Sequence, residues 1–379
     1  MKIIRIISFT DAGHALAGQL CSAFSLRGED AAAVLCNGSS GVSLREWTEH
    51  AFRKDRVLIF VGACGIAVRA IAPFIRNKAE DPAVLVMDEK GAFCIPVLSG
   101  HLGEANRYAV LAAEITGGIP VITTATDVNG LFAVDVFAAE NGMKISSMEA
   151  AKRFSASILS SGRAALTIPA AFSEEIRAEG PVPPEITLSS SFTGSAAECL
   201  ISPELPRRGP ASPEADPAGQ PLQLIPRCLI LGIGCRKGVS TERLAEFTES
   251  LLCTAGLDQR AVRCIASIDL KEKEPGIIGL AERLGVPFLT YSPEELMKTE
   301  GSFAFSEFVL RTTGADNVCE RAAAAAGAVR LLIRKSTGDG MTAAAGIAET
   351  VLRFPGPAEK EGTPDRAGTP DGGKERRKE

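Results

Sequence analysis

The sequence predicts an α/β protein in which two larger α/β domains flank a small middle segment. Short apolar runs alternate with amphipathic stretches up to about residue 123, and the alternation restarts near residue 227. Several of these runs are apolar throughout, which is typical of strands buried on both faces of a parallel sheet. Between the two regions, residues 202–226 contain seven prolines, which break helices and cannot donate to a sheet, so we expect an extended linker there.

These patterns divide the chain into five parts. We expect a three-layer α/β/α domain over residues 1–144, a small middle segment over 145–201, a linker over 202–226, a second α/β domain with a mixed sheet over 227–354, and a tail over 355–379. The tail mixes proline, glycine and charges of both signs, so it has no apolar surface to bury and we expect it to be disordered.

In the first domain, apolar runs predict strands, and apolar residues at helical spacing predict the helices between them. Ser43 and Glu46 form a capping box that starts one helix, and Gly28 ends another. A polar turn at 88–91 joins two apolar runs into a hairpin. The expected strands are residues 3–7, 32–35, 57–61, 83–87, 92–97 and 121–123, and the expected helices are 11–27, 43–52, 66–74 and 102–116.

The middle segment has a weaker pattern, with one expected helix at 147–160, a few short strands and an extended stretch at 181–184. In the second domain, Ser292, Pro293 and Glu295 form a capping box with proline at the first helical position. The other expected elements of this domain are strands at 228–233, 262–267, 287–290 and 328–334, and helices at 240–255, 276–284, 303–312 and 317–326.

Composition excludes several classes of protein. The 379 residues include 41 Lys+Arg and 46 Asp+Glu, so the net charge of −5 provides no basic field for nucleic acid or an anionic membrane. Aromatic residues make up only 5%, which argues against rows of stacked bases. No window approaches the roughly 18–20 unbroken apolar residues of a membrane span. The ten cysteines form no C-x-x-C pair, so we expect reduced thiols in a cytoplasmic protein and no metal site.

The first candidate site follows the apolar strand at 57–61. Gly62 and Gly65 lie where this strand turns into a helix, so backbone N–H groups face outward there and attract a carboxylate or phosphate. Ligands of open α/β sheets bind at such carboxyl ends of strands. A tight turn that uses glycine only for its backbone freedom is the alternative.

The second candidate site is the turn after the strand at 92–97. Ser99 and Gly100 form a small-residue turn, and His101, Glu104 and Asn106 cluster at the start of the next helix. The pKa of a histidine side chain lies near neutral pH, which suits general acid–base catalysis. A structural helix cap is the alternative.

The third candidate site follows the strand at 121–123. Thr124 and Asp127 belong to a run of three hydroxyls and one carboxylate, which could orient water or bind polar groups of a ligand. Alternatively, Asp127 caps the turn before Asn129 and Gly130.

In the second domain, Gly232 and Gly234 open a segment similar to a dinucleotide-binding turn. The third glycine, Gly238, comes one residue late, and Arg236 and Lys237 are unusual for that motif, so we interpret the segment as an anion-binding turn. Segments 267–274 and 316–320 place mixed charges at the ends of predicted elements, and the second segment contains Glu320. Each segment could be a solvated cap or a binding site, and both interpretations stay open.

Together, these segments resemble one family in their order along the chain and in their amino-acid sequences. The phrases are GACGIAVRAIAPFIRNKAEDPAVLVMDEKG at 62–91, VLSGHLGEANRYA at 97–109, PVITTATD at 120–127, LGIGCRKG at 231–238, IASIDLKEKEPG at 265–276, GADNVCERAAA at 314–324, and Lys335. They resemble the CbiG family of cobalt-precorrin-5A hydrolases in anaerobic cobalamin biosynthesis. The second half also resembles the CobE-type domain of the aerobic pathway.

The resemblance implies a substrate and a reaction. The substrate is a cobalt-bearing, ring-contracted macrocycle in which a δ-lactone joins the ring A acetate to an extruded two-carbon unit. Water opens the lactone, the two carbons leave as acetaldehyde, and the product is cobalt-precorrin-5B. The reaction has no redox step and the cobalt belongs to the substrate, so the resemblance implies no cofactor.

For this implied reaction, the candidate residues allow a mechanistic hypothesis. We expect His101 to be the base that activates water or takes the alcohol proton, Glu104 or Asp127 to orient it, and Thr124 with the N–H groups of 62–66 to stabilise the lactone oxyanion. His101 as an axial ligand of the cobalt is the competing hypothesis. The acetates and propionates of the macrocycle require cations and N–H groups. The expected substrate-binding residues are Gly62, Gly65, Arg69, Lys78, Ser99, Gly100, Asn106, Gly232, Gly234, Arg236, Lys237 and Glu320.

Two other functions stay open at this point. A non-catalytic corrinoid carrier would use the same anion-binding turns, and a nucleotide-dependent enzyme would use the turn at Gly232. We expect a small-molecule corrinoid as the partner, with neither nucleic acid nor membrane bound. Whether the chain forms a homodimer or channels its substrate to other cobalamin-pathway enzymes also stays open.

Overall fold

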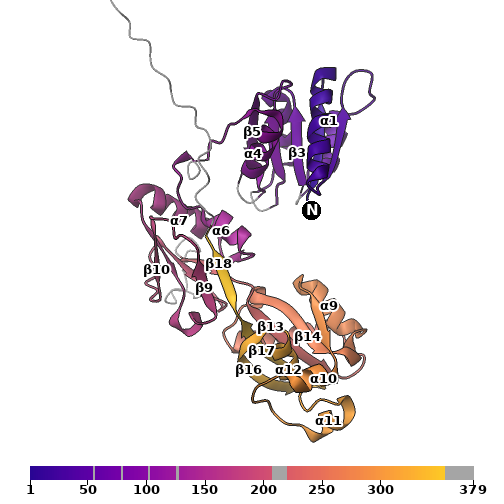
Figure 1. The fold of residues 1–379 in the computed structure, drawn as a ribbon, viewed down its shortest axis with the longest axis vertical. Coiled ribbons are helices and arrows are strands. Elements are labelled where there is room, and N and C mark those ends of the chain that lie inside the picture. Colours follow the sequence, from indigo (N-terminus) through magenta and orange to yellow (C-terminus); the bar gives the residue numbers. More distant parts are fainter. Residues whose placement is uncertain (54–55, 78–79, 101–102, 125–127, 207–219, 355–379) are drawn as a thin grey trace, which may run out of the picture.

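The computed structural model describes residues 1–53, 56–77, 80–100, 103–124, 128–206 and 220–354. In Figure 1 these residues form three α/β bodies that follow one another along the chain, each around a sheet of its own. Most of the expected linker and the whole expected tail lie outside the described residues.

The N-terminal body contains a six-stranded sheet in the order β2-β1-β3-β4-β5-β6. Strands β2, β1, β3 and β4 are parallel, β5 runs antiparallel to β4, and β6 is parallel to β5. The hairpin expected from the sequence is therefore present as β4 and β5. The bounds are β1 Ile3–Ser8, β2 Asp30–Leu35, β3 Arg56–Val61, β4 Ala83–Met87, β5 Phe93–Leu98 and β6 Ile119–Pro120.

Helices cover both faces of this sheet because its strands are apolar on both sides. Val57, Ile59 and Val61 of β3 pack with α1 and α4. Leu58 and Phe60 of the same strand point the other way and pack with α2 and α3. The three-layer α/β/α domain is confirmed. The helices are α1 Asp11–Leu26, α2 Leu44–Ala51, α3 Cys64–Ile71 with a 3₁₀ turn at Ala72–Phe74, and α4 Ala105–Thr116.

The middle body has a five-stranded sheet in the order β10-β8-β11-β12-β7. Strand β12 corrects the linker prediction, because it lies within residues 202–226. Its residues 222–225 are buried and pair in parallel with β11. The prolines on either side of this short apolar run hid the strand. The elements are α6 Val134–Glu140, β7 Lys144–Ile145, α7 Met148–Ser161, β8 Ala164–Thr167, a 3₁₀ turn Ala170–Phe172, β9 Ile176–Glu179, β10 Ile186–Ser189, β11 Glu198–Ile201 and β12 Leu222–Ile225.

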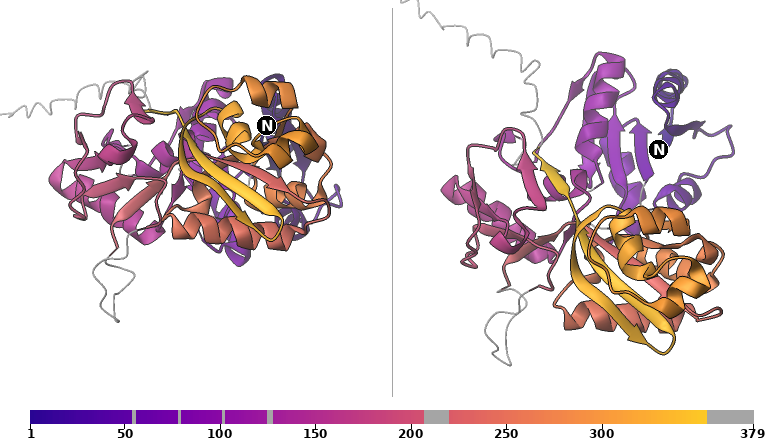
Figure 2. Two further views of the ribbon diagram at one scale, coloured as in Figure 1. Left: turned by 90° about the horizontal axis from the view of Figure 1, so that it is seen from below. Right: turned by 60° about the horizontal axis from the view of Figure 1, so that its bottom comes forward.

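The C-terminal body has a mixed sheet, as expected, in the order β15-β14-β13-β17-β16. Strands β13, β14 and β15 are parallel, whereas β17 is antiparallel to both β13 and β16. Figure 2 shows the long β16 and β17 side by side along this body. Its strands are β13 Leu229–Cys235, β14 Val262–Ile268, β15 Phe288–Tyr291, β16 Ala328–Gly338 and β17 Met341–Ala348.

Helices α8 and α9 cover one face of this sheet, and α10 and α12 cover the other. Helix α11 has no buried residue. The capping box predicted at Ser292 and Glu295 is confirmed, since it starts α10. The helices are α8 Thr241–Thr254, α9 Pro275–Leu284, α10 Pro293–Lys298, α11 Glu307–Thr313 and α12 Val318–Ala325, with 3₁₀ turns at Gln259–Ala261 and Asp269–Lys271.

The sequence analysis missed the last two strands. Strand β17 consists largely of alanine and glycine, residues that are depleted in strands, and it forms only because β13 and β16 flank it. Strand β18, Thr350–Arg353, pairs in parallel with β9 of the middle body. The Arg330 guanidinium also lies 2.6 Å from the Glu175 carboxylate of that body. The end of the chain therefore links the C-terminal body to the middle one.

Among the residues that the structure describes, no helix combines the length and the apolar character needed to cross a membrane.

Candidate functional site

The direction of β5 separates the candidate residues of the N-terminal body into two groups. Leu98, at the end of β5, pairs with Val84 near the start of β4. Gly62 follows β3, and its N–H donates to the carbonyl of Met87 at the end of β4. Strand β4 has five residues, so at about 3.3 Å per residue its two ends lie about 13 Å apart. The Gly62 turn and the Ser99 turn are therefore at opposite edges of the sheet.

One edge brings together Ser99, Gly100, Asn106 and Thr124, which we call the hydroxyl edge. Strand β6 is parallel to β5, so the chain that follows it reaches the edge where β5 ends. The Asn106 amide donates from Nδ2 to Thr124 Oγ1 over 3.0 Å, and the Ser99 hydroxyl donates to the carbonyl of Asp81 over 3.0 Å. The sequence predicted these four residues separately, and the structure assembles them.

Close packing explains the glycine of this edge. A Cβ atom on Gly100 would lie 2.8 Å from Asn106 Oδ1, and the Asn106 N–H donates to the Gly100 carbonyl over 3.0 Å. Ser99 adopts the left-handed backbone conformation with φ 56°, which is uncommon for a residue other than glycine. The hydroxyl edge is therefore a tightly built turn whose side chains have fixed positions.

Glu104 lies at the same edge and already holds two cations. Its Oε2 is 3.0 Å from Lys2 Nζ, and its Oε1 is 2.7 Å from the Arg107 guanidinium. Burial alone would raise the pKa of Glu104, but hydrogen bonds and charges from Lys2 and Arg107 outweigh it and hold the pKa below its ordinary value. The Glu104 carboxylate is thus ionised and engaged at neutral pH.

The opposite edge of the sheet carries the first candidate site, which we call the glycine edge. A Cβ atom on Gly62 would lie 2.7 Å from the ring of Phe9, so ring packing accounts for this glycine. The exposed Arg69 folds back over the first turn of α3, with its guanidinium nitrogens 3.5 Å from where a Cβ of Gly65 would be. The sequence predicts one oxyanion site made by Thr124 and the 62–66 turn, and that shared role is wrong because the two lie at opposite edges.

Three predicted site residues, Lys78, His101 and Asp127, lie outside the described residues. Their roles stay predictions. His101 directly follows Gly100 in the chain, and Asp127 comes three residues after Thr124.

In the C-terminal body, packing also explains the glycines of the predicted anion-binding turn. A Cβ atom on Gly232 would lie 1.8 Å from the backbone oxygen of Cys319 in α12. A Cβ atom on Gly234 would lie 2.6 Å from Thr342 Oγ1 in β17. These two glycines allow a helix and a strand to approach β13, which is a structural role.

The cations of this turn are exposed where β13 ends. Arg236 and Lys237 both face solvent, and the Arg236 N–H donates to the Gly340 carbonyl over 2.9 Å. The Glu274 carboxylate braces the turn, since it accepts from the Gly238 N–H over 2.8 Å and from Lys271 Nζ over 2.8 Å. The hydrogen bond from Lys271 is the main reason that the pKa of Glu274 lies below its ordinary value. We call Arg236, Lys237 and Lys271 the basic edge.

Glu320 corrects a prediction, because its side chain is internal. It is 1% exposed and accepts hydrogen bonds from the N–H groups of Ala304 and Lys335 and from the Asn317 amide, each over 2.8–2.9 Å. These three donors occupy both carboxylate oxygens, so Glu320 does not reach a substrate. The spacing of Asn317 and Glu320, which matches a helix-capping pattern, was the available signal.

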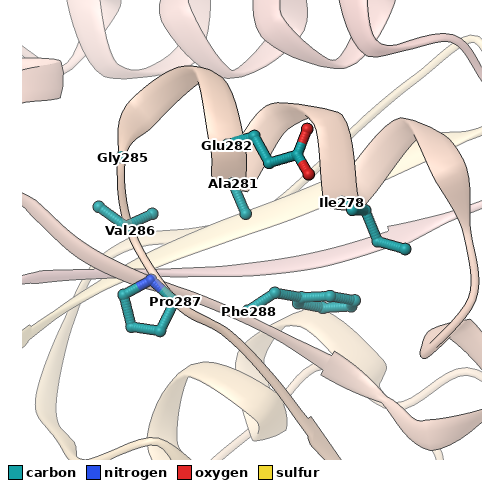
Figure 3. Close-up of a pocket in the computed structure, with 7 residues that line it drawn as sticks. All are labelled: Ile278, Ala281, Glu282, Gly285, Val286, Pro287 and Phe288. Atoms are coloured by element: carbon teal, nitrogen blue, oxygen red, sulfur yellow. The ribbon is translucent and has the colours of Figure 1, made fainter.

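Two features of the described residues bear on metals and pockets. No group of three or more His, Cys, Asp or Glu side chains within the described ranges is placed to hold a metal ion. Figure 3 shows a largely apolar pocket between the end of α9 and the start of β15. The pocket lies where β15 begins, whereas the basic edge lies where β13 and β14 end, and these strands are parallel to β15. None of the predicted site residues lines it. Its lining consists of Ile278, Ala281, Glu282, Gly285, Val286, Pro287 and Phe288.

Comparison with known proteins identifies the family of this chain. Three profiles match successive parts of the chain: "Cobalamin synthesis G N-terminal" over residues 46–127, "Cobalamin biosynthesis central region" over 132–226, and "Cobalamin synthesis G C-terminus" over 229–346. A protein of Salmonella typhimurium named "Cobalt-precorrin-5A hydrolase" is 36% identical over 299 residues, which are 79% of this chain and 84% of that protein. The chain belongs to the CbiG family.

Other relatives agree with this membership. The "Cobalt-precorrin-5A hydrolase" of Priestia megaterium is 33% identical over 300 residues, which are 78% of this chain and 80% of that protein. "Protein CobE" of Sinorhizobium sp is 33% identical over 96 residues, which are 25% of this chain and 62% of that protein. The match to CobE falls in the C-terminal region, so the CbiG-family and CobE-type resemblances seen in the sequence are both confirmed.

Gly232→Ala is expected to destabilise the C-terminal body. The added methyl group would meet a backbone oxygen, which cannot move aside without displacing α12, and overpacking of this kind costs on the order of 3 kcal/mol. Urea unfolding measures the loss. Gly18→Ala is the matched control, because it adds a methyl group to α1 with nothing within 4 Å. A wild-type midpoint for Gly232→Ala would contradict the packing role.

Glu274→Gln is expected to lower stability at neutral pH but not in acid. The folded-state pKa of Glu274 is depressed, so its contribution is present above the ordinary value of 4.5 and is lost as the pH falls through the lower folded value. The difference in unfolding free energy between wild type and variant should therefore shrink below about pH 4.5. Glu272→Gln, at an exposed neighbour, is the control. A difference that does not change with pH would contradict the charged interaction.

Proposed function

We propose that this chain is a cobalt-precorrin-5A hydrolase. The observation that carries the proposal is its similarity to the Salmonella typhimurium protein of that name, which extends over 84% of that protein's length. The hydroxyl edge supports it, because it assembles donors of the kind that an ester hydrolysis uses.

The proposed reaction consumes one water. Water adds to the carbonyl carbon of the ring A δ-lactone, and the bond between this carbon and the ring oxygen breaks to give a carboxylate and an alkoxide. The alkoxide collapses to a carbonyl as the bond between the two-carbon unit and the macrocycle breaks. The electron pair of that bond stays on the macrocycle, acetaldehyde leaves, and cobalt-precorrin-5B remains.

Thr124 is the proposed donor to the developing oxyanion. Its oxygen accepts the Asn106 amide hydrogen, which leaves its own O–H to point at a substrate oxygen. The backbone N–H of Asn106 donates to the Gly100 carbonyl, which anchors the residue that carries this amide and limits the reorganisation needed when charge develops. Preorganised donors of this kind contribute strongly to acyl-transfer catalysis.

His101 is the proposed base that activates water, and Asp127 is the proposed group that orients it. Glu104 is less suited to that second role, because Lys2 and Arg107 hold both of its oxygens. The proposed reaction transfers no electrons to or from an external partner, so it requires no resident cofactor, and the cobalt arrives as part of the substrate.

A reducing compartment fits this proposal. All ten cysteines lie within the described residues and are free thiols, and several are buried with raised pKa values, as burial raises the pKa of Cys94 to about 12. Thiols in this state are typical of cytoplasmic proteins, so we propose that the reaction takes place in the cytoplasm.

The direct test is anoxic incubation of the full chain with the lactone-bearing cobalt intermediate and a hydrazine that traps aldehydes. One acetaldehyde per macrocycle converted is the expected result. Tight binding of the intermediate without aldehyde would overturn the proposal and identify a corrinoid carrier.

Thr124→Val is expected to slow acetaldehyde release by about 10²-fold at saturating substrate, because it removes one oxyanion donor and keeps the side-chain shape. Single-turnover kinetics measure this rate. Thr123→Val, at the exposed neighbouring position, is the control and should keep the wild-type rate. An unchanged rate for Thr124→Val would remove Thr124 from catalysis.

A further inference from the structure

Asp81 is a buried carboxylate next to the hydroxyl edge. It is 7% exposed and comes two residues before β4, at the end of that strand where the Ser99 turn lies. Its carboxylate accepts from the Arg76 N–H, with Oδ1 at 3.0 Å and Oδ2 at 3.2 Å from that nitrogen. Among the residues that the structure describes, no cation forms an ion pair with Asp81. A carboxylate can accept about four hydrogen bonds, so Asp81 keeps unused bonding capacity.

Direct contacts tie Asp81 to the hydroxyl edge. Its carbonyl accepts from the Ser99 hydroxyl over 3.0 Å. A Cβ atom on Gly103 would lie 3.1 Å from the Ala83 nitrogen, so the turn that begins at Ser99 packs against the start of β4. Asp81 is therefore fixed against the same turn that anchors Asn106.

Asp81 and Thr124 are close enough for one substrate to contact both. Strands β4, β5 and β6 are neighbours in the sheet, and Asp81 precedes β4 whereas Thr124 follows β6. Neighbouring strands are about 4.8 Å apart, so the two backbones lie about 10 Å apart across the sheet. A macrocycle with its lactone is wider than this gap, and side chains from both ends narrow it.

A structural role does not explain the charge of Asp81. Its N–H donates to the Asn77 carbonyl over 3.0 Å, so a backbone hydrogen bond already closes the loop before β4. The Arg76 N–H needs only an acceptor oxygen, which a neutral amide would also provide. Burial of a carboxylate without a cation costs free energy, and a catalytic role is one reason that such a group persists.

The proposed reaction has two protons to dispose of. Water adds to the lactone, and a carboxylate and an alkoxide form, so both protons of the water are given up. His101, the proposed base, takes the first. The second is on the alcohol oxygen when the ring opens, and it leaves before the two-carbon unit can separate. A second base at the same edge can take it without prior release of the first proton.

We propose that Asp81 is this second base. Its carboxylate takes the alcohol proton, and the O–H electron pair becomes the C=O bond of acetaldehyde. The electron pair of the broken C–C bond stays on the macrocycle, and the protonated Asp81 then returns its proton to solvent. The inference rests on the proposed function for the reaction, and it adds a catalytic residue outside the set predicted from the sequence.

Asp81→Asn tests this role, because the amide oxygen still accepts from the Arg76 N–H while the base is lost. The full chain is incubated with the lactone-bearing cobalt intermediate under anoxic conditions, and the macrocycles are identified by mass spectrometry. The expected product has gained one water and keeps the two-carbon unit, and acetaldehyde release is slowed by about 10²-fold. Glu80→Gln, at the exposed neighbouring position, is the matched control and should behave like wild type.

The outcomes separate this inference from the proposed function. Acetaldehyde release at the wild-type rate by Asp81→Asn would overturn the inference and leave the hydrolase intact. Slow release without the water-added macrocycle would also overturn it, because Asp81 would then act on lactone opening or on folding. A wild type that releases no acetaldehyde would overturn the proposed function, and the inference with it.

A second variant keeps the test decisive if the amide disturbs the loop. Asp81→Ala leaves space for a small carboxylate, so added formate should restore part of the acetaldehyde release. Asp81→Asn lacks this space and should not respond to formate. Urea unfolding shows that both variants are folded. A folded Asp81→Ala that formate does not rescue would contradict the role of Asp81 as a base.

Discussion

The antiparallel pairing of β5 with β4 is the constraint on which the candidate site depends. If β5 ran parallel to its neighbour, the turn that begins at Ser99 would lie beside Gly62 at the carboxyl ends of the strands. Because β5 is reversed, that turn reaches the opposite edge, where the parallel β6 also delivers Thr124. Strand direction therefore decides which polar residues can act on one substrate.

Close packing is a second constraint. It explains the glycines of the motifs but not the cations that accompany them. Gly62, Gly100 and Gly232 each lie where a Cβ atom would meet a ring, an amide or a helix backbone. In the C-terminal motif, Arg236 and Lys237 follow the closely packed Gly232 and Gly234 and present their charges to solvent. Gly62, Gly100 and Gly232 thus report close packing and need no ligand to explain them.

Much of the fold can be predicted from the sequence. Apolar runs and helical spacing predict β1, β3, α1, α8 and the β4–β5 hairpin, because burial on both faces leaves an unambiguous pattern. The alanine- and glycine-rich β17 cannot be recognised in this way, since its neighbours and not its own side chains make it a strand. Strand β12 was hidden by the prolines that flank it.

The candidate site was predictable in part. Residue types and turns pointed to Ser99, Asn106 and Thr124 one segment at a time, but their hydrogen-bonded proximity depends on pairing between strands. The structural role of Glu320, by contrast, could not be predicted from its residue type and position in the sequence. Its place among mixed charges at an element end left a solvated cap and a binding group both open, and only the tertiary fold reveals three N–H donors around it.

The central claim is that catalysis takes place at the hydroxyl edge and not at the glycine edge. The most direct measurement is the single-turnover rate of acetaldehyde release by Asn106→Ala and Arg69→Ala, one variant from each edge. The account predicts that, at saturating substrate, the Asn106 variant is slowed because Thr124 loses its anchor, whereas the Arg69 variant keeps the wild-type rate of the chemical step. A slow Arg69 variant beside a normal Asn106 variant would contradict it.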